Sequence, residues 1–148
     1  MQEKVIATKQ KVVDKKDQLI DKAFAPSGFS KPDSESNKNR FKEYLNVDLT
    51  KDIKNIYSYA DFFGADYKIL VSFSCDTSTI SKIIKSKGLT LSNDENDNGL
   101  SFGEEFPWWD KKAIENIKPF KEGKELEYWK YLWFDKERKT AYYEEFSL

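Results

Sequence analysis

The sequence contains no histidine, and this absence excludes several kinds of active site at once. Ser-His-Asp triads, Cys-His nucleophiles and HExxH zinc sites all need an imidazole, as does a histidine switch that responds to pH near neutrality. The sequence also has no GxxxxGK[ST] phosphate loop, no GxGxxG dinucleotide fingerprint and no SxxK pattern. We therefore expect a protein that is not an enzyme.

Cysteine is almost absent too, since Cys75 is the only one, so no intrachain disulfide or CxxC site forms. We interpret Cys75 as a small core residue; the alternative is a thiol activated by a helix N-terminus. One thiol does not fix the compartment. The chain starts MQEKVIATKQ without a signal peptide. A periplasmic or secreted location is favoured if a leader was removed, and a cytoplasmic one otherwise.

Long apolar runs and a basic excess are missing as well. No stretch of 18 apolar residues occurs, so we expect no membrane-spanning helix. The net charge is -1, which argues against a nucleic-acid partner because such proteins need basic residues to neutralise phosphates. The expected partner is another protein, and the oligomeric state stays open.

Aromatic residues are abundant, at 16% of the chain, which indicates a folded protein with a real core. The predicted class is α+β: a mostly antiparallel sheet of about four strands packed by two or more helices, with a long N-terminal helix. We divide the chain into a helical arm over residues 1–24, a linker or long loop over residues 25–40, and a single α+β domain over residues 41–148.

The clearest elements lie in the middle of the chain. Tyr67–Cys75 alternates apolar and polar residues, which predicts a strand. Asp76–Lys87 is predicted as a helix with capping oxygens before it and Gly88 after it. Ile53–Gly64 fits both a helical face and a strand, and we favour the strand because Gly64 begins a turn typical of hairpins. Leu89–Phe102 is predicted as a small hairpin.

The C-terminal part predicts a short helix, Trp109–Ile117, followed by two antiparallel strands, Tyr128–Phe134 and Thr140–Leu148. One register places Trp133 opposite Tyr142, and the register shifted by one residue is the alternative. In the first register, Lys130 faces Glu145 and Trp129 faces Phe146.

Two short segments predict ligand sites. Asp94–Glu105 has the spacing D-x-[DN]-x-[DN]-G-x5-E and resembles an EF-hand calcium loop over those twelve residues. Its flanks differ from that family, because Gly88 ends the nearby helix and Pro107 follows the loop; the alternative is an Asn/Asp/Gly-rich turn. The candidate calcium ligands are Asp94, Asn96, Asn98, Leu100 and Glu105. The candidate carbohydrate-binding residues are Trp108, Trp109 and Asp110.

The segment EYWKYLWF carries aromatic side chains on both of its faces, which leaves two interpretations. Either both faces of a central strand are covered by the protein itself, or one face is an aromatic surface that binds a partner. The second predicts a non-enzymatic binding protein of a bacterial accessory, lipoprotein-like or immunity type, and the alternative is an extracellular calcium- or carbohydrate-binding module. The partner-binding candidates are Trp129, Tyr131, Trp133, Tyr142 and Tyr143.

Overall fold

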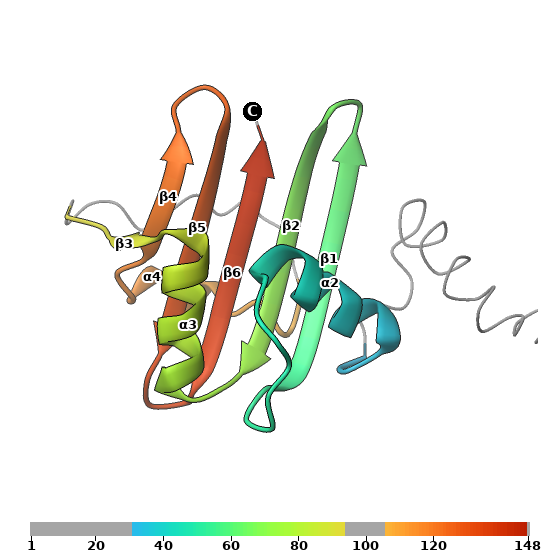
Figure 1. Cartoon of the computed structure of the whole chain (residues 1–148), viewed down its shortest axis with the longest axis vertical. Coiled ribbons are helices and arrows are strands. Elements are labelled where there is room, and N and C mark those ends of the chain that lie inside the picture. The colour runs from blue at the N-terminus through green and yellow to red at the C-terminus, as the bar shows by residue number, and fades with distance from the viewer. Residues whose placement is uncertain (1–30, 94–105, 148) are drawn as a thin grey trace, which may run out of the picture.

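The computed structural model describes residues 31–93 and 106–147 of the chain. In this part, six strands form one open sheet in the order β1-β2-β6-β5-β4-β3, and every neighbouring pair is antiparallel (Figure 1). The α+β class is confirmed, with six strands instead of about four. The predicted N-terminal helix, residues 1–24, lies outside the described residues. The elements are β1 (Lys54–Phe63), β2 (Asp66–Ser74), β3 (Thr90–Leu91), β4 (Phe120–Lys124), β5 (Tyr128–Asp135), β6 (Thr140–Ser147), α2 (Glu35–Leu45), α3 (Thr77–Lys87) and α4 (Lys111–Glu115).

The first two strands form the hairpin that the sequence predicts. β1 pairs with β2 from Tyr57 to Phe63, so the strand interpretation of Ile53–Gly64 is confirmed. Phe63 and Asp66 close a two-residue turn, and Gly64 has φ +67°. Glycine at this first turn position is what a type II′ hairpin turn requires.

The predicted register of the last two strands is also confirmed. Trp133 lies opposite Tyr142, and Lys130 lies opposite Glu145. β6 does not stop at this hairpin, because its other edge pairs with β2 from Lys68 to Ser74. The last strand in the chain order is therefore central in the sheet.

One strand, β4, was not predicted, and another, β3, lies in the predicted Leu89–Phe102 hairpin but pairs differently. β4 has the sequence FKEGK, whose charged residues and glycine hide the alternation expected of a strand. Thr90 and Leu91 of β3 pair with β4, so this part of the predicted Leu89–Phe102 hairpin has a different partner. The rest of that segment, from residue 94, lies outside the described residues.

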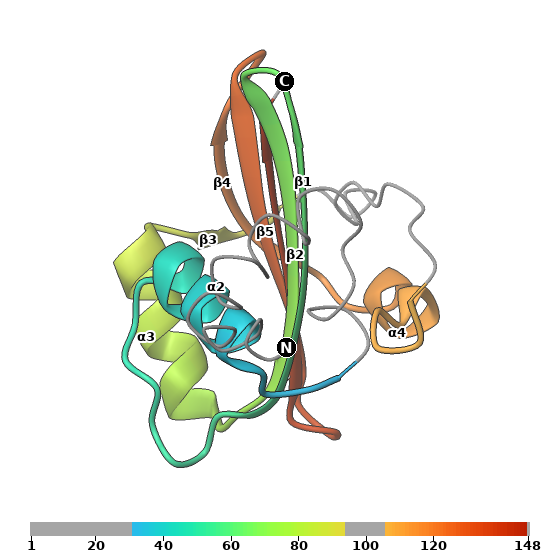
Figure 2. The ribbon, with the colours of Figure 1, turned by 90° about the vertical axis from the view of Figure 1, so that its right-hand side faces the viewer.

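One face of the sheet is covered by α2 and α3 (Figure 2). α2 begins at Glu35, so residues 35–40 are helical, whereas the sequence prediction placed them in a linker or loop. The side chain of Ser34 caps this helix by accepting a hydrogen bond from the N–H of Asn37. Phe41 and Leu45 are fully buried against the sheet. Tertiary packing of these two side chains stabilises a segment whose own composition is polar.

α3 confirms the predicted helix, including its C-terminal Gly88 in the left-handed conformation. Its N-terminus is capped differently from the prediction, since the side chain of Asp76 makes no capping hydrogen bond. Asp52, in the loop between α2 and β1, takes this role. Its Oδ2 accepts hydrogen bonds from the N–H of Asp76, at 2.9 Å, and from the hydroxyl of Thr79, at 2.6 Å.

The capping by Asp52 predicts a specific loss of stability in acid. Desolvation raises the pKa of Asp52, but hydrogen bonds from Asp76, Thr50 and Thr79 outweigh it and hold the pKa well below its usual value. A carboxyl group with a lowered folded-state pKa contributes stability above its unfolded pKa of about 4, and this contribution is lost as the pH falls further. We expect Asp52→Asn to cost ~1 kcal/mol at neutral pH and to flatten the decline below pH ~4.

Urea unfolding at a series of pH values measures this effect. Asp48→Asn changes an exposed carboxylate in the same loop and serves as the matched control. If Asp52→Asn and Asp48→Asn lose stability in acid equally fast, Asp52 is not the group responsible.

The other face of the sheet carries α4 and the Trp108–Trp109 segment (Figure 2). The predicted helix Trp109–Ile117 is confirmed in a shorter form, and Asp110 caps it by accepting from the N–H of Ala113. Both faces of β5 are therefore covered by the protein itself from Tyr131 to Phe134, as the first of the two interpretations required, whereas Tyr128 to Lys130 are only half-buried. In the part of the chain that the structure describes, no helix is long and apolar enough to cross a membrane.

Candidate functional site

Four of the five residues predicted to bind a partner lie inside the protein. Trp133 and Tyr143 have no exposed area, and Tyr131 and Tyr142 expose 5% and 3% of their surface. Tyr143 belongs to the core beneath α2 and α3, whereas the other three lie on the opposite face. Trp129, the fifth, is half-buried. Most of the predicted surface is thus core.

The centre of the α4 face is an aromatic cluster built around Trp109. Its ring meets Trp133 edge-on at a centroid distance of 6.1 Å and Tyr142 at 5.6 Å. Edge-to-face contacts of this kind are favourable because the positive ring edge meets the negative ring face. Trp109 is only 4% exposed, so it is a core residue and does not present a ring face to a sugar.

Half-buried aromatic side chains surround this buried centre, and we call them the aromatic rim. Trp108 stacks on Tyr57 at 5.5 Å and on Phe106 at 4.9 Å, and Phe106 contacts Tyr59 at 5.0 Å. β1 contributes the tyrosines, and the segment before α4 contributes the other two. All four are partly exposed; Tyr59, Phe106 and Trp108 pack against the buried centre, and Tyr57 is held through its stacking on Trp108. The aromatic rim consists of Tyr57, Tyr59, Phe106, Trp108 and Trp129.

Trp129 has a fixed position in the rim because it packs over a glycine. Gly123 lies directly opposite Trp129 in the sheet. A Cβ atom at Gly123 would lie 2.6 Å from Cδ2 of the indole and 2.5 Å from the carbonyl oxygen of Tyr128, closer than packed atoms allow. The Lys121 ammonium lies 5.6 Å from the centre of the Trp129 ring, within cation–π range.

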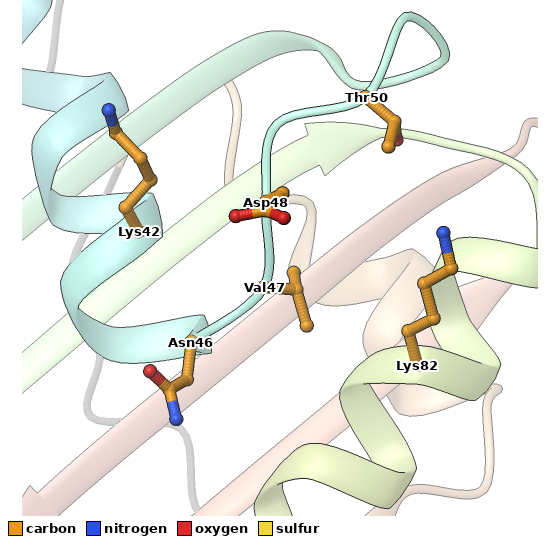
Figure 3. Close-up of a pocket in the computed structure, with 6 residues that line it drawn as sticks. All are labelled: Lys42, Asn46, Val47, Asp48, Thr50 and Lys82. Carbon is orange, nitrogen blue, oxygen red and sulfur yellow. The ribbon is translucent and has the colours of Figure 1, made fainter.

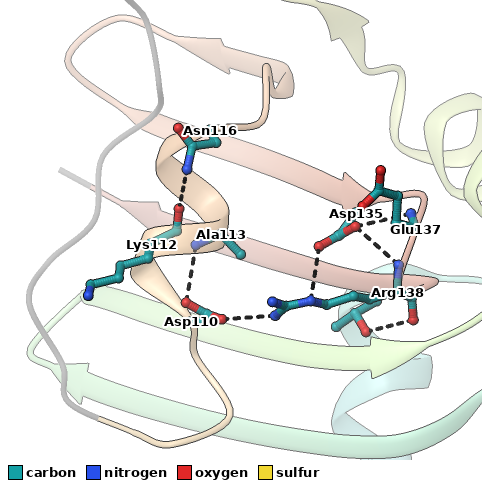
Figure 4. Close-up of polar contacts among 8 residues, drawn as sticks. Asp110, Lys112, Ala113, Asn116, Asp135, Glu137 and Arg138 are labelled. Atoms are coloured by element: carbon teal, nitrogen blue, oxygen red, sulfur yellow. Dashed lines mark hydrogen bonds and ion pairs between the residues drawn. The ribbon is translucent and has the colours of Figure 1, made fainter.

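A polar network attaches α4 to the turn between β5 and β6 (Figure 4). One carboxylate oxygen of Asp110 caps α4, and the other lies 3.2 Å from Nη1 of Arg138. Nε of Arg138 lies 3.8 Å from Asp135, whose second oxygen accepts from the backbone N–H groups of Glu137 and Arg138. Asp110, a carbohydrate candidate in the sequence prediction, thus positions α4 and with it the neighbouring Trp109.

No family model, curated protein or solved structure matches this chain.

A second cluster of functional groups lies on the face that carries α2 and α3. The carboxylate of Glu145 accepts a hydrogen bond from the Tyr143 hydroxyl at 2.6 Å and another from the Tyr67 hydroxyl at 2.6 Å. Nζ of Lys87, at the end of α3, lies 4.0 Å from the same carboxylate. We call these four residues the tyrosine–glutamate cluster. Nothing in the sequence pattern brings Tyr67 and Glu145 together, because 78 residues separate them.

The protonation of this cluster follows from its burial. Burial raises the pKa of Tyr143 well above its usual value, and the charge of Glu145 raises it further. Desolvation and the hydrogen bond to Glu145 likewise raise the pKa of Tyr67. Burial lowers the pKa of Lys87, whereas Glu145 opposes that shift. At neutral pH the two hydroxyls are therefore protonated, and each can donate its hydrogen bond to Glu145.

Cys75 lies in the core, where burial raises the pKa of its thiol to about 12. A thiol in this state is a poor nucleophile, which fits the interpretation of Cys75 as a small core residue. Within residues 31–93 and 106–147, no three His, Cys, Asp or Glu side chains gather in a way that could hold a metal ion. The calcium candidates Asp94, Asn96, Asn98, Leu100 and Glu105 lie outside the described residues.

An open hollow of about 480 Å³ lies between the end of α2 and α3 (Figure 3). Lys42 and Lys82 enter it from the two helices, with Asp48 between them on the connecting loop. All three side chains are exposed to solvent. A carboxylate between two solvated lysines does not select an anionic ligand, so we assign no site to this hollow.

Proposed function

We propose that the protein is a non-catalytic binding protein that contacts another protein through its aromatic rim. The observation that supports this most is the half-exposed ring of Tyr57, Tyr59, Phe106, Trp108 and Trp129 around a buried aromatic centre. Tyr and Trp are enriched at protein interfaces because they combine a large contact area, rigidity and a polar atom. The rim side chains are already held by ring contacts, so they lose little conformational freedom on binding.

The charges near the rim indicate the chemistry of the partner. Three lysines lie on and beside α4, and Lys121 lies over Trp129. The acidic residues of the same segment are Asp110, which is paired with Arg138, and Glu115. A partner surface with apolar side chains and carboxylates fits this arrangement, because opposite charges around an apolar contact favour association and specificity. The three lysines are Lys111, Lys112 and Lys118.

The test is capture of partners from an extract of the source cells with the purified full-length chain, followed by mass spectrometry. Tyr57→Ala and Trp108→Ala each remove one of two rim rings that stack on each other. Leu126→Ala removes an apolar side chain that is 81% exposed in the turn between β4 and β5 and is not part of the rim or of the buried centre, and it is the matched control. We expect a protein retained by the wild type and by Leu126→Ala to lose about tenfold or more in affinity for each rim variant.

Thermal melts of the three variants must accompany this experiment, since a rim variant that unfolds says nothing about binding. A folded Trp108→Ala that retains the same proteins with the same affinity as Leu126→Ala would contradict the proposal. So would a wild-type chain that retains no protein beyond the background of an unrelated bait.

A further inference from the structure

Lys87, in the last turn of α3, differs from the other lysines of this helix in its burial. Its side chain exposes 13% of its surface, whereas Lys82 and Lys85 are exposed to solvent. An amine that leaves water needs acceptors around it, because an ammonium group carries a charge and three N–H donors. The groups around Lys87 therefore decide which form of its nitrogen the protein favours.

A negative charge lies near the Lys87 amine, but no acceptor does. Within the part of the chain that the structure describes, Nζ of Lys87 donates no hydrogen bond. The nearer oxygen of Glu145 is 4.0 Å away, and both oxygens of this carboxylate already accept hydrogen bonds from tyrosine hydroxyls. The ring of Tyr143 has its centre 6.0 Å from Nζ. The ammonium form of Lys87 thus has a counter-charge without a hydrogen-bond partner.

The other charged groups near Lys87 belong to β5 and β4. Lys130 lies opposite Glu145 in the sheet, and its own Nζ is 3.7 Å from Glu122. Burial is the main cause that lowers the pKa of Lys87; Glu145 and Glu122 oppose this shift, and Lys130 adds to it. More of Lys87 is therefore a neutral amine near neutral pH than in a solvated lysine. Only the neutral amine is a nucleophile.

We propose that Lys87 is a covalent binding site for small aldehydes, which it holds as a protonated Schiff base. The lone pair of the neutral amine attacks the carbonyl carbon, and the carbonyl oxygen takes up two protons and leaves as water. A C=N double bond remains. Overall, the lysine ammonium and the aldehyde give an iminium and water, so the step needs no oxidant or reductant.

Two features of the surroundings favour the iminium over the free ammonium. The iminium has one N–H where the ammonium has three, so fewer donors are left without an acceptor in this half-buried place. The iminium also keeps the positive charge that faces the Glu145 carboxylate. Acylation of the same nitrogen would remove that charge. The small exposed fraction of Lys87 restricts the ligand to a small molecule.

Site-resolved reductive methylation of the purified full-length chain tests this inference. Formaldehyde is the probe, and cyanoborohydride reduces each imine to a stable methylamine that tandem mass spectrometry localises. Lys82 and Lys85 are the matched controls, because they lie on the same helix and meet the reagents in the same sample. At neutral pH we expect the first methylation of Lys87 to be about tenfold faster than that of Lys85. As the pH is raised, the rate for Lys87 should level off before the rate for Lys85.

The same measurement in concentrated urea separates the effect of the fold from that of the local sequence. In the unfolded chain the three lysines are all solvated, so they should react at equal rates. Methylation of Lys87 that is no faster than that of Lys85 in the folded protein would overturn the inference. So would a preference for Lys87 that persists in urea. No partner protein takes part in this test, so its outcome is independent of the aromatic rim.

Discussion

Trp133→Ala is expected to destabilise the protein by about 3–5 kcal/mol, the range for removing a large aromatic side chain from a packed core. Trp133 has no exposed surface. Its ring meets Trp109 edge-on and stacks on Tyr131 at 5.6 Å, so the substitution removes contacts with both residues. The cavity cannot close easily, because the rings that line it belong to different elements. Urea unfolding monitored by far-UV circular dichroism measures the loss.

Trp129→Ala is the matched control for this prediction. It removes the same side chain four residues away on the same face of β5, where the ring is half-buried. Because less area is buried and the rim is open to solvent, we expect a loss of about 1–2 kcal/mol. Equal losses for the two variants would contradict the assignment of Trp133 to the core and Trp129 to the rim.

Glu145→Leu is expected to lower the free energy of unfolding by about 3 kcal/mol, because the groups that bind the carboxylate lose their partner. Glu145 is 7% exposed, and Tyr143 is fully buried. Without the carboxylate, the buried Tyr143 hydroxyl loses its acceptor and the half-buried Lys87 loses its counter-charge. A buried donor without an acceptor costs more than the hydrogen bond itself contributes.

The control for this prediction is a double-mutant cycle. In a Tyr143→Phe background the hydroxyl is already absent, so Glu145→Leu should cost roughly 1 kcal/mol less than in the wild type. The free energy of unfolding of the four proteins gives the coupling directly. Identical costs in both backgrounds would show that the Tyr143–Glu145 hydrogen bond does not stabilise the fold.

The elements that the sequence predicts well are those whose signals are local. The apolar face and the Gly88 stop define α3 within a dozen residues, and Gly64 with its flanking alternation defines the first hairpin. The register of β5 and β6 that places Trp133 opposite Tyr142 was favoured because it also pairs Lys130 with Glu145 and Trp129 with Phe146.

The elements that the sequence misses are stabilised by distant residues. β4 has a weak strand composition and is held by its neighbours β5 and β3. α2 carries only Phe41 and Leu45 as fully buried apolar residues, and its polar start was interpreted as loop. Both segments adopt their structure because tertiary contacts override local propensity.

The sequence indicated that the candidate site would be aromatic, but it did not indicate which aromatic residues would form it. The aromatic abundance near the C-terminus indicated a cluster, yet the extent of self-packing depends on Trp109, which reaches β5 and β6 from outside the hairpin. The rim tyrosines Tyr57 and Tyr59 were visible as alternate residues of NIYSYADFF, but their neighbours Phe106 and Trp108 lie about 50 residues away. Pairing over such separations is set by the fold and leaves no local pattern.

The central place of β6 constrains the order in which the protein can assemble. β6 joins β2 to β5, and its pairing of Phe146 with Lys68 closes a loop of 78 residues. A nascent chain that has not yet left the ribosome as far as residue 147 holds two separate half-sheets with open inner edges. Closing so long a loop is slow, and until then the unpaired side of β2 is exposed to wrong partners. Folding of this protein is therefore expected to be completed only after β6 has been synthesised. Until then, we expect chaperones to protect the β1–β2 hairpin.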